Sequence, residues 1–135
     1  MGQYDPCMAD IEKITINMNV VDLGKVDLLV EEGFYTNRTD FIRTAIRNQL
    51  TKHEDEVRNS IGRHEMFIGV LHYGRSDLEE FRRGGEKLTI KITGLFSLGN
   101  DVTPELARAT IASLKVVGVF RASAAVKDAL SDRVR

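Results

Sequence analysis

Within residues 12–50 the hydrophobic period changes once, and this change sets the local structure. Residues 12–18 alternate strictly between polar and apolar side chains, which is the pattern of a half-buried β-strand. From residue 21 onward apolar side chains recur every three or four positions, as in an amphipathic helix, and Gly33 is placed to end that helix. A second apolar stripe follows over residues 41–50. The sequence therefore predicts a strand, a helix, a short turn and a second helix.

One strand and two short helices cannot close a hydrophobic core alone. The strand lacks a partner for its backbone groups, and each helix keeps an uncovered face. A second copy of the chain must supply the missing half. If two such strands pair antiparallel across a two-fold axis, their apolar residues pack against the helices. Their polar residues then form an outward-facing two-stranded ribbon, whose side chains are Lys13, Thr15 and Asn17.

The C-terminal half contains an internal repeat. Residues 90–97 align with residues 114–121, with Lys, Gly and Phe in register. Each copy predicts a strand followed by a short helix, the first helix capped by Thr103 and the second by Ser123. A weaker third copy precedes them, with a capping box that begins at Ser76. Three strand-helix units predict parallel strands in a small α/β domain.

These patterns divide the chain into four parts and predict an α+β fold class. We expect residues 1–11 to be a flexible N-terminal arm and residues 12–52 to hold the strand and two helices. Residues 53–62 are polar, without apolar periodicity, and are predicted as a linker, with a frayed extension of the second helix as the alternative. Residues 63–135 form the repeat-containing domain.

Composition excludes several classes of protein. With 42% apolar residues, 29% charged residues and no long apolar run, the chain fits a globular fold and not a membrane protein. The N-terminus lacks a secretory pattern, and the single cysteine, Cys7, closes no disulfide within the chain, so we expect a cytoplasmic protein. The net charge of −1 is uneven, because the chain is acidic up to residue 56 and basic after it.

Three segments together resemble one known family. They are Lys13–Met18, the helix ending at Gly33, and Asn37–Arg47, in which Asn37 is placed as a helix N-cap. In order and spacing they are similar to the ribbon-helix-helix DNA-binding proteins of the CopG, Arc and methionine-repressor superfamily, over residues 12 to about 50. That resemblance implies an intertwined dimer whose paired strands enter the DNA major groove. It also implies that the N-terminus of the second helix binds phosphate.

The ribbon side chains suit recognition of base edges. Lys13 can donate to guanine, Asn17 can pair with adenine, and Thr15 can donate, accept or offer its methyl group. The groups expected to contact phosphate are Lys25, Asn37, Arg38 and Thr39. The acidic residues of the first helix are expected on faces away from DNA; they are Asp22, Asp27, Glu31 and Glu32. The alternative is a solvated ribbon that serves assembly alone.

No catalytic, metal or cofactor site is expected. Some nickel-responsive repressors join a ribbon-helix-helix to a C-terminal sensor, but the three histidines here form no His-x-His pair and have no carboxylate at ligand spacing. There is no nucleophile turn and no phosphate-binding glycine loop. We therefore expect a protein that is not an enzyme.

The sequence predicts a DNA-binding transcriptional regulator, most simply a repressor. It would bind double-stranded DNA as an obligate homodimer and be nucleoid-associated. We expect the C-terminal domain to join dimers into higher oligomers through exposed sheet edges. Binding of a signal or partner protein and contact with flanking DNA are the alternatives for that domain. Two other functions stay open for the whole chain: an antitoxin, and a nucleoid-architectural assembly protein.

Overall fold

The computed structural model describes residues 11–135, so residues 1–10 of the expected N-terminal arm lie outside the described residues. The chain divides into two compact units. One unit is Lys13–Ser60, and the other runs from Ile61 to Arg135 and includes Ile11 and Glu12.

Two helices build the first unit, α1 (Val20–Glu31) and α2 (Arg38–Lys52). Helix α1 starts one residue earlier than its apolar stripe indicates, because Asn19 caps it and accepts from the amide of Val21 at 2.8 Å. Helix α1 ends where Gly33 takes a left-handed backbone angle (φ 86°). Both helices and the glycine stop are as the sequence predicts.

The predicted linker at residues 53–62 is helical. Helix α3 (Glu54–His64) follows α2 after a break at His53. Its first turn is acidic and its last turn is basic. The side-chain charges at both ends therefore have the opposite sign to the helix dipole there, which stabilises the helix. Arg58 also forms ion pairs with Glu54 at 3.5 Å and Asp55 at 3.1 Å. These local pairs favour a helix although no side chain of α3 is buried.

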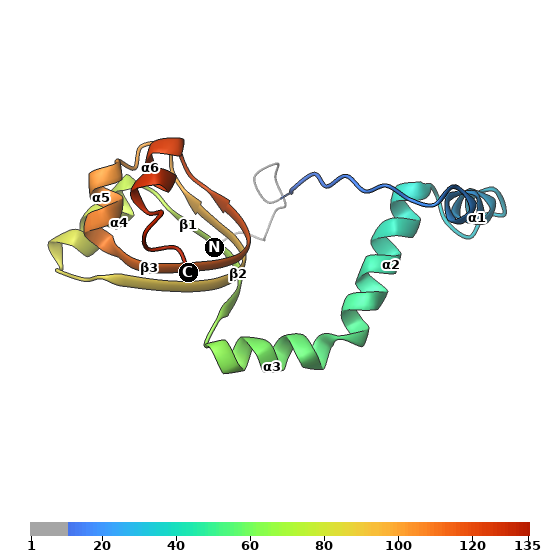
Figure 1. Ribbon diagram of the computed structural model, residues 1–135, viewed down its shortest axis with the longest axis horizontal. Coiled ribbons are helices and arrows are strands. Elements are labelled where there is room, and N and C mark those ends of the chain that lie inside the picture. Colours follow the sequence, from blue (N-terminus) through green and yellow to red (C-terminus); the bar gives the residue numbers. More distant parts are fainter. Residues whose placement is uncertain (1–10) are drawn as a thin grey trace. The chain divides into compact units, whose positions relative to one another are not determined.

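The second unit alternates strands and helices around a three-stranded sheet (Figure 1). All strand pairs are parallel, and the spatial order is β1-β2-β3. The elements in chain order are β1 (Phe67–Tyr73), α4 (Arg75–Arg83), β2 (Leu88–Leu98), α5 (Pro104–Thr110), β3 (Ile111–Arg121) and α6 (Ala124–Ala129).

Helix starts in this unit mostly match the expected caps. Thr103 accepts from the amide of Leu106, and Ser123 accepts from the amide of Val126, both at 3.2 Å, which confirms these two N-caps. The capping box expected at Ser76 is wrong. Helix α4 begins at Arg75 after Gly74, and the Gly74 amide donates to the Asp77 carboxylate at 2.9 Å.

The core of this unit lies between one face of the sheet and its helices. Phe96 of β2 is fully buried and stacks on Phe120 of β3 at 5.5 Å between ring centroids. Leu78 of α4 and Leu130, just after α6, are also fully buried and belong to the same cluster. This unit therefore has its own hydrophobic core, whereas Lys13–Ser60 buries one side chain among its described residues, Val26.

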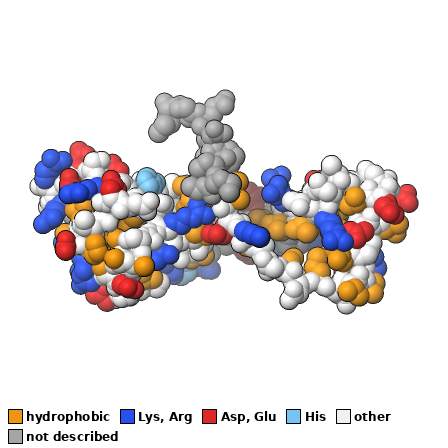
Figure 2. Space-filling view, turned by 90° about the horizontal axis from the view of Figure 1, so that it is seen from above, with side chains coloured by type: hydrophobic (Ala, Val, Ile, Leu, Met, Phe, Trp, Pro, Cys, Tyr) orange, Lys and Arg blue, Asp and Glu red, His pale blue; other side chains and the backbone are white. Residues whose placement is uncertain are grey.

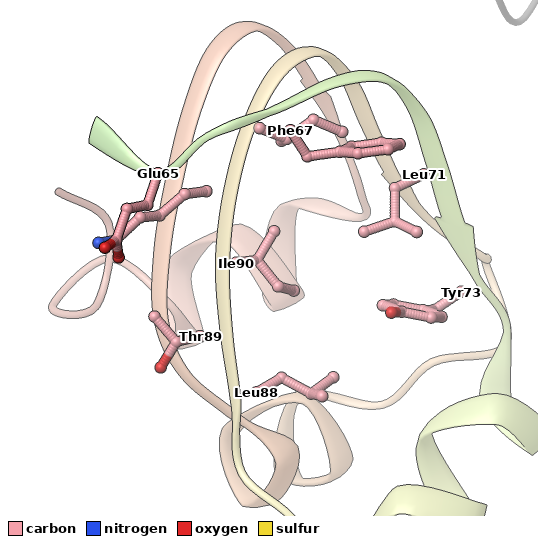
Figure 3. Close-up of a pocket in the computed structure, with 9 residues that line it drawn as sticks. Glu65, Phe67, Leu71, Tyr73, Leu88, Thr89 and Ile90 are labelled. Carbon is pink, nitrogen blue, oxygen red and sulfur yellow. The ribbon is translucent and has the colours of Figure 1, made fainter. Parts of the chain in front are cut away.

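A row of glycines crosses all three strands. Gly69, Gly94 and Gly118 are aligned in register, and each has a positive φ, of 144°, 136° and 128° respectively. The strands arch strongly in the close-up of this sheet (Figure 3). A Cβ atom on Gly94 would lie 2.1 Å from the carbonyl oxygen of Gly69, so the row permits an approach between neighbouring backbones that no other residue type allows.

Candidate nucleic-acid interface

The residues predicted to read bases are all on the surface of the first unit. Lys13, Thr15 and Asn17 are exposed, in a segment that belongs to no helix or strand of the single chain. The expectation of a half-buried strand is therefore not met within one chain. The reason is that a strand needs a ladder partner, and the described part of Lys13–Ser60 contains no strand to provide one.

The apolar side of this segment is as exposed as its polar side. Ile14 and Ile16 are 69% and 60% exposed. Apolar side chains on the two helices and in the turn between them are exposed as well, and they are Val20, Val21, Leu28, Phe34, Ile46 and Leu50. Figure 2 shows apolar side chains at the surface between charged ones. So many exposed apolar side chains on one small unit favour an interaction surface.

The start of α2 presents the groups expected to contact phosphate. Asn37 is the N-cap, and its side-chain oxygen accepts from the amide of Asp40 at 2.8 Å. The Asp40 carboxylate in turn accepts from the amide of Thr36 at 3.0 Å. Among the described residues, the amides of Arg38 and Thr39 have no acceptor outside the helix, and first-turn amides have none within it. These two amides are available to an anion.

Arg38 is engaged by an acid from the other helix. Its guanidinium donates to both carboxylate oxygens of Asp27, at 2.7 Å and 2.8 Å. These hydrogen bonds, with a smaller charge attraction, lower the pKa of Asp27 and raise the pKa of Arg38. Asp27, one of the acids expected on faces away from DNA, therefore lies against a residue that is expected to contact phosphate. Sequence reasoning missed the pair because it depends on how the two helices pack.

Lys25, the remaining residue expected to contact phosphate, is exposed on α1. An aromatic contact helps to hold the turn between the helices, where Tyr35 meets Phe41 edge to face with ring centroids 5.0 Å apart. The turn and the N-terminus of α2 are thereby fixed to each other.

A second feature is a hollow of about 460 Å³ in the C-terminal unit (Figure 3). Phe67, Leu71 and Tyr73 from β1 and Leu88 and Ile90 from β2 point into it. Its lining is mainly apolar. Within the described residues no cluster of three or more histidine, cysteine or acidic side chains is placed to hold a metal ion.

Comparison with known proteins identifies the family. A model of the ribbon-helix-helix transcriptional regulator family matches residues 9–127. The chain belongs to this family. It is also similar to the transcriptional regulator CdrS of Halobacterium salinarum, with 30% identity over 47 residues, which are 35% of this chain and 86% of that protein. No solved structure matches the chain.

The family match extends well beyond the likeness seen in the sequence. That likeness ends at about residue 50, whereas the family match continues to residue 127 and so covers all six strands and helices after α3 almost to the end of α6. The C-terminal unit is therefore part of the ribbon-helix-helix family pattern here. In the described part of the chain, no helix has the length and apolar character needed to span a membrane.

Proposed function

We propose that this protein is a sequence-specific DNA-binding repressor that acts as a homodimer. The observation that carries the proposal is the segment at residues 12–18, which exposes apolar side chains on one side and Lys13, Thr15 and Asn17 on the other. Pairing with the same segment of a second copy would bury the apolar side against the helices and leave the polar side outward. Membership of a family of transcriptional regulators supports the same function.

In this proposal, the paired segments lie in the major groove and read base edges. Lys13 donates to guanine O6 and N7, and Asn17 makes paired hydrogen bonds with adenine. Thr15 contacts either a base edge or a thymine methyl group. Because two copies contribute equivalent residues, the preferred DNA site would contain inverted or tandem short repeats.

Phosphate contacts would fix the position of the dimer on DNA. The amides of Arg38 and Thr39 at the start of α2 would donate to a phosphate oxygen, which supplies the acceptor that they lack in the free chain. Arg38 and Lys25 add positive charge. The ion pair with Asp27 neutralises part of the charge of Arg38. The electrostatic contribution to affinity is therefore modest for a DNA-binding protein.

Repression would follow from occupation of a promoter site by the dimer. An antitoxin is less well supported, because a toxin-wrapping segment is expected to be disordered when free. Here the C-terminal unit has a closed core of its own. An architectural protein would share the DNA contacts but would bind all sequences alike.

The proposal is tested by a triple variant, Lys13→Ala with Thr15→Ala and Asn17→Ala, in the full chain. It should lose discrimination between its DNA site and scrambled DNA while keeping the wild-type mass in solution. The matched control changes the same residue types at exposed positions of the C-terminal unit, with Thr89→Ala, Lys91→Ala and Asn100→Ala. Retained discrimination in the ribbon variant, or equal loss in the control, would refute base reading by the ribbon.

A further inference from the structure

Strand β1 is an unprotected sheet edge. It pairs with β2 on one side, and within residues 11–135 no strand pairs with its other side. Phe67 and Ile68 are 54% and 57% exposed, and Val70 is 44% exposed. The strand, FIGVLHY, contains no proline, lysine, arginine or acidic residue. Natural proteins usually protect such an edge with charge, proline or a covering segment, so a free apolar edge indicates a pairing partner.

The opposite edge of the sheet is partly covered by the chain itself. Residues after α6 lie beside the first half of β3, where Leu114 forms a parallel bridge with Val134. The amide of Leu114 donates to the carbonyl of Arg133 at 3.0 Å, and the amide of Arg135 donates to the carbonyl of Leu114 at 2.8 Å. A second copy therefore cannot continue the sheet from the start of β3, whereas the second half of β3 is not covered in this way by the described residues.

We infer that β1 pairs antiparallel with β1 of a second copy, around a two-fold axis at Val70. Pairing of the same edge on both copies closes the assembly at two chains, whereas head-to-tail pairing of β1 with the free part of β3 would give an open-ended stack. The product is one continuous sheet that contains the three strands of each copy. This inference goes beyond the proposed function and does not rest on it.

The sequence of β1 is compatible with self-pairing in this register. Phe67 of one copy lies opposite Tyr73 of the other, and Ile68 lies opposite His72, so apolar and aromatic side chains face each other across the axis. No two like charges meet, because β1 has no lysine, arginine or acidic residue. Outside the strand, the chain turns at Glu65 with a φ of 52° and enters α4 at Arg75, so the pairing is confined to residues 67–73.

Disulfide trapping tests the axis directly. In a full-length Cys7→Ser background, Val70→Cys puts two equivalent thiols opposite each other. Paired antiparallel strands hold such Cα atoms about 4.5–5.5 Å apart, and disulfides span about 4.4–6.8 Å. The matched control is Val117→Cys on β3, which replaces a valine of similar exposure, 50%.

Mild oxidation should link Val70→Cys chains into pairs on a non-reducing gel and leave Val117→Cys chains single. A link at Ile68→Cys or His72→Cys instead would move the axis by two residues along β1 and keep the pairing. No link at any of the three β1 positions, or an equal link at Val117→Cys, would overturn the inference.

Amide hydrogen exchange gives a second test that does not use cysteine. In full-length protein, Val70→Lys places two charges at the axis and should raise exchange in residues 67–73 by about tenfold or more. Val117→Lys should leave exchange in that segment unchanged. Unchanged protection of β2 and β3 in both variants shows that the unit stays folded. Wild-type exchange of residues 67–73 in Val70→Lys would contradict self-pairing, whatever the DNA experiments show.

Discussion

Substitution of Gly94 by alanine should destabilise the C-terminal unit severely. Gly94 lies in the middle of the glycine row with a φ of 136°, a backbone conformation that residues with a side chain rarely adopt. An alanine Cβ at this position would also lie 2.1 Å from the Gly69 carbonyl oxygen and 3.1 Å from its carbonyl carbon. Both atoms belong to the backbone of a paired strand, so neither can move aside without breaking the ladder.

The magnitude follows from these two contributions. The forced backbone conformation costs about 1–3 kcal/mol, and overpacking against a fixed backbone costs another ~1–3 kcal/mol. Gly94→Ala should therefore lower the free energy of unfolding by about 2–6 kcal/mol, a large part of the 5–15 kcal/mol that is typical of a domain. Gly118→Ala should behave alike, since its Cβ would lie 2.2 Å from the Gly94 carbonyl oxygen. Gly69→Ala should lose only the first contribution, because its nearest neighbour is the movable Phe67 side chain at 3.3 Å.

Urea unfolding followed by circular dichroism, at one fixed protein concentration, measures the series. The control is Gly62→Ala in α3, where a Cβ meets no atom within 4 Å. That control should gain about 0.5–1 kcal/mol, because alanine replaces glycine inside a helix. The reasoning is refuted if Gly94→Ala is as stable as wild type, or if Gly69→Ala loses more than Gly94→Ala does.

Other predictions concern a helix end and the Asp27–Arg38 pair. Glu65 follows α3 with a φ of 52°, and the backbone hydrogen bonds there follow the same pattern as those that end α1 at Gly33. Because a residue with a side chain is strained in this conformation, Glu65→Gly should raise the free energy of unfolding by about 1 kcal/mol, and Gly33→Glu should lower it. Thermal unfolding compares the two variants. Asp27→Asn should release Arg38 and raise DNA affinity by about three- to tenfold for every sequence alike, as measured by titration of specific and scrambled DNA; a change in discrimination would count against a phosphate role for Arg38. Because the folded pKa of Asp27 is lowered, its pairing with Arg38 stabilises the protein above about pH 4 and is lost as the pH falls through the folded pKa. The stability difference between wild type and Asp27→Asn should vanish at low pH, and a difference that grows on acidification would contradict this sign.

Features that depend on neighbouring residues could be predicted from the sequence. The N-caps Asn37, Thr103 and Ser123 follow from side chains that bond amides three residues away. The alignment of Gly94 with Gly118 within the repeat agrees with their pairing in the sheet. Helix α3 was also within reach, since its charge order and the pairs made by Arg58 are local. The sequence did not predict α3 because the segment has no apolar stripe, and such a stripe indicates that a helix is buried, not that a helix forms.

Features that depend on packing could not be predicted in this way. The contact between Asp27 and Arg38 joins two helices whose relative angle no local pattern specifies. The segment at residues 12–18 is the clearest case, because its alternation describes a strand that one chain cannot form. Its exposed apolar side chains are consistent with the partner segment that we propose in a second chain.

The central claim is tested most directly by selecting the fragments of a random DNA pool that the full-length protein binds. Binding of the recovered sequence is then compared with binding of scrambled DNA by titration at two salt concentrations. Ribbon reading by two copies predicts enrichment of a short inverted or tandem repeat, bound about 10³-fold or more tightly than scrambled DNA. Binding without enrichment, or no binding at either salt concentration, would contradict a sequence-specific repressor.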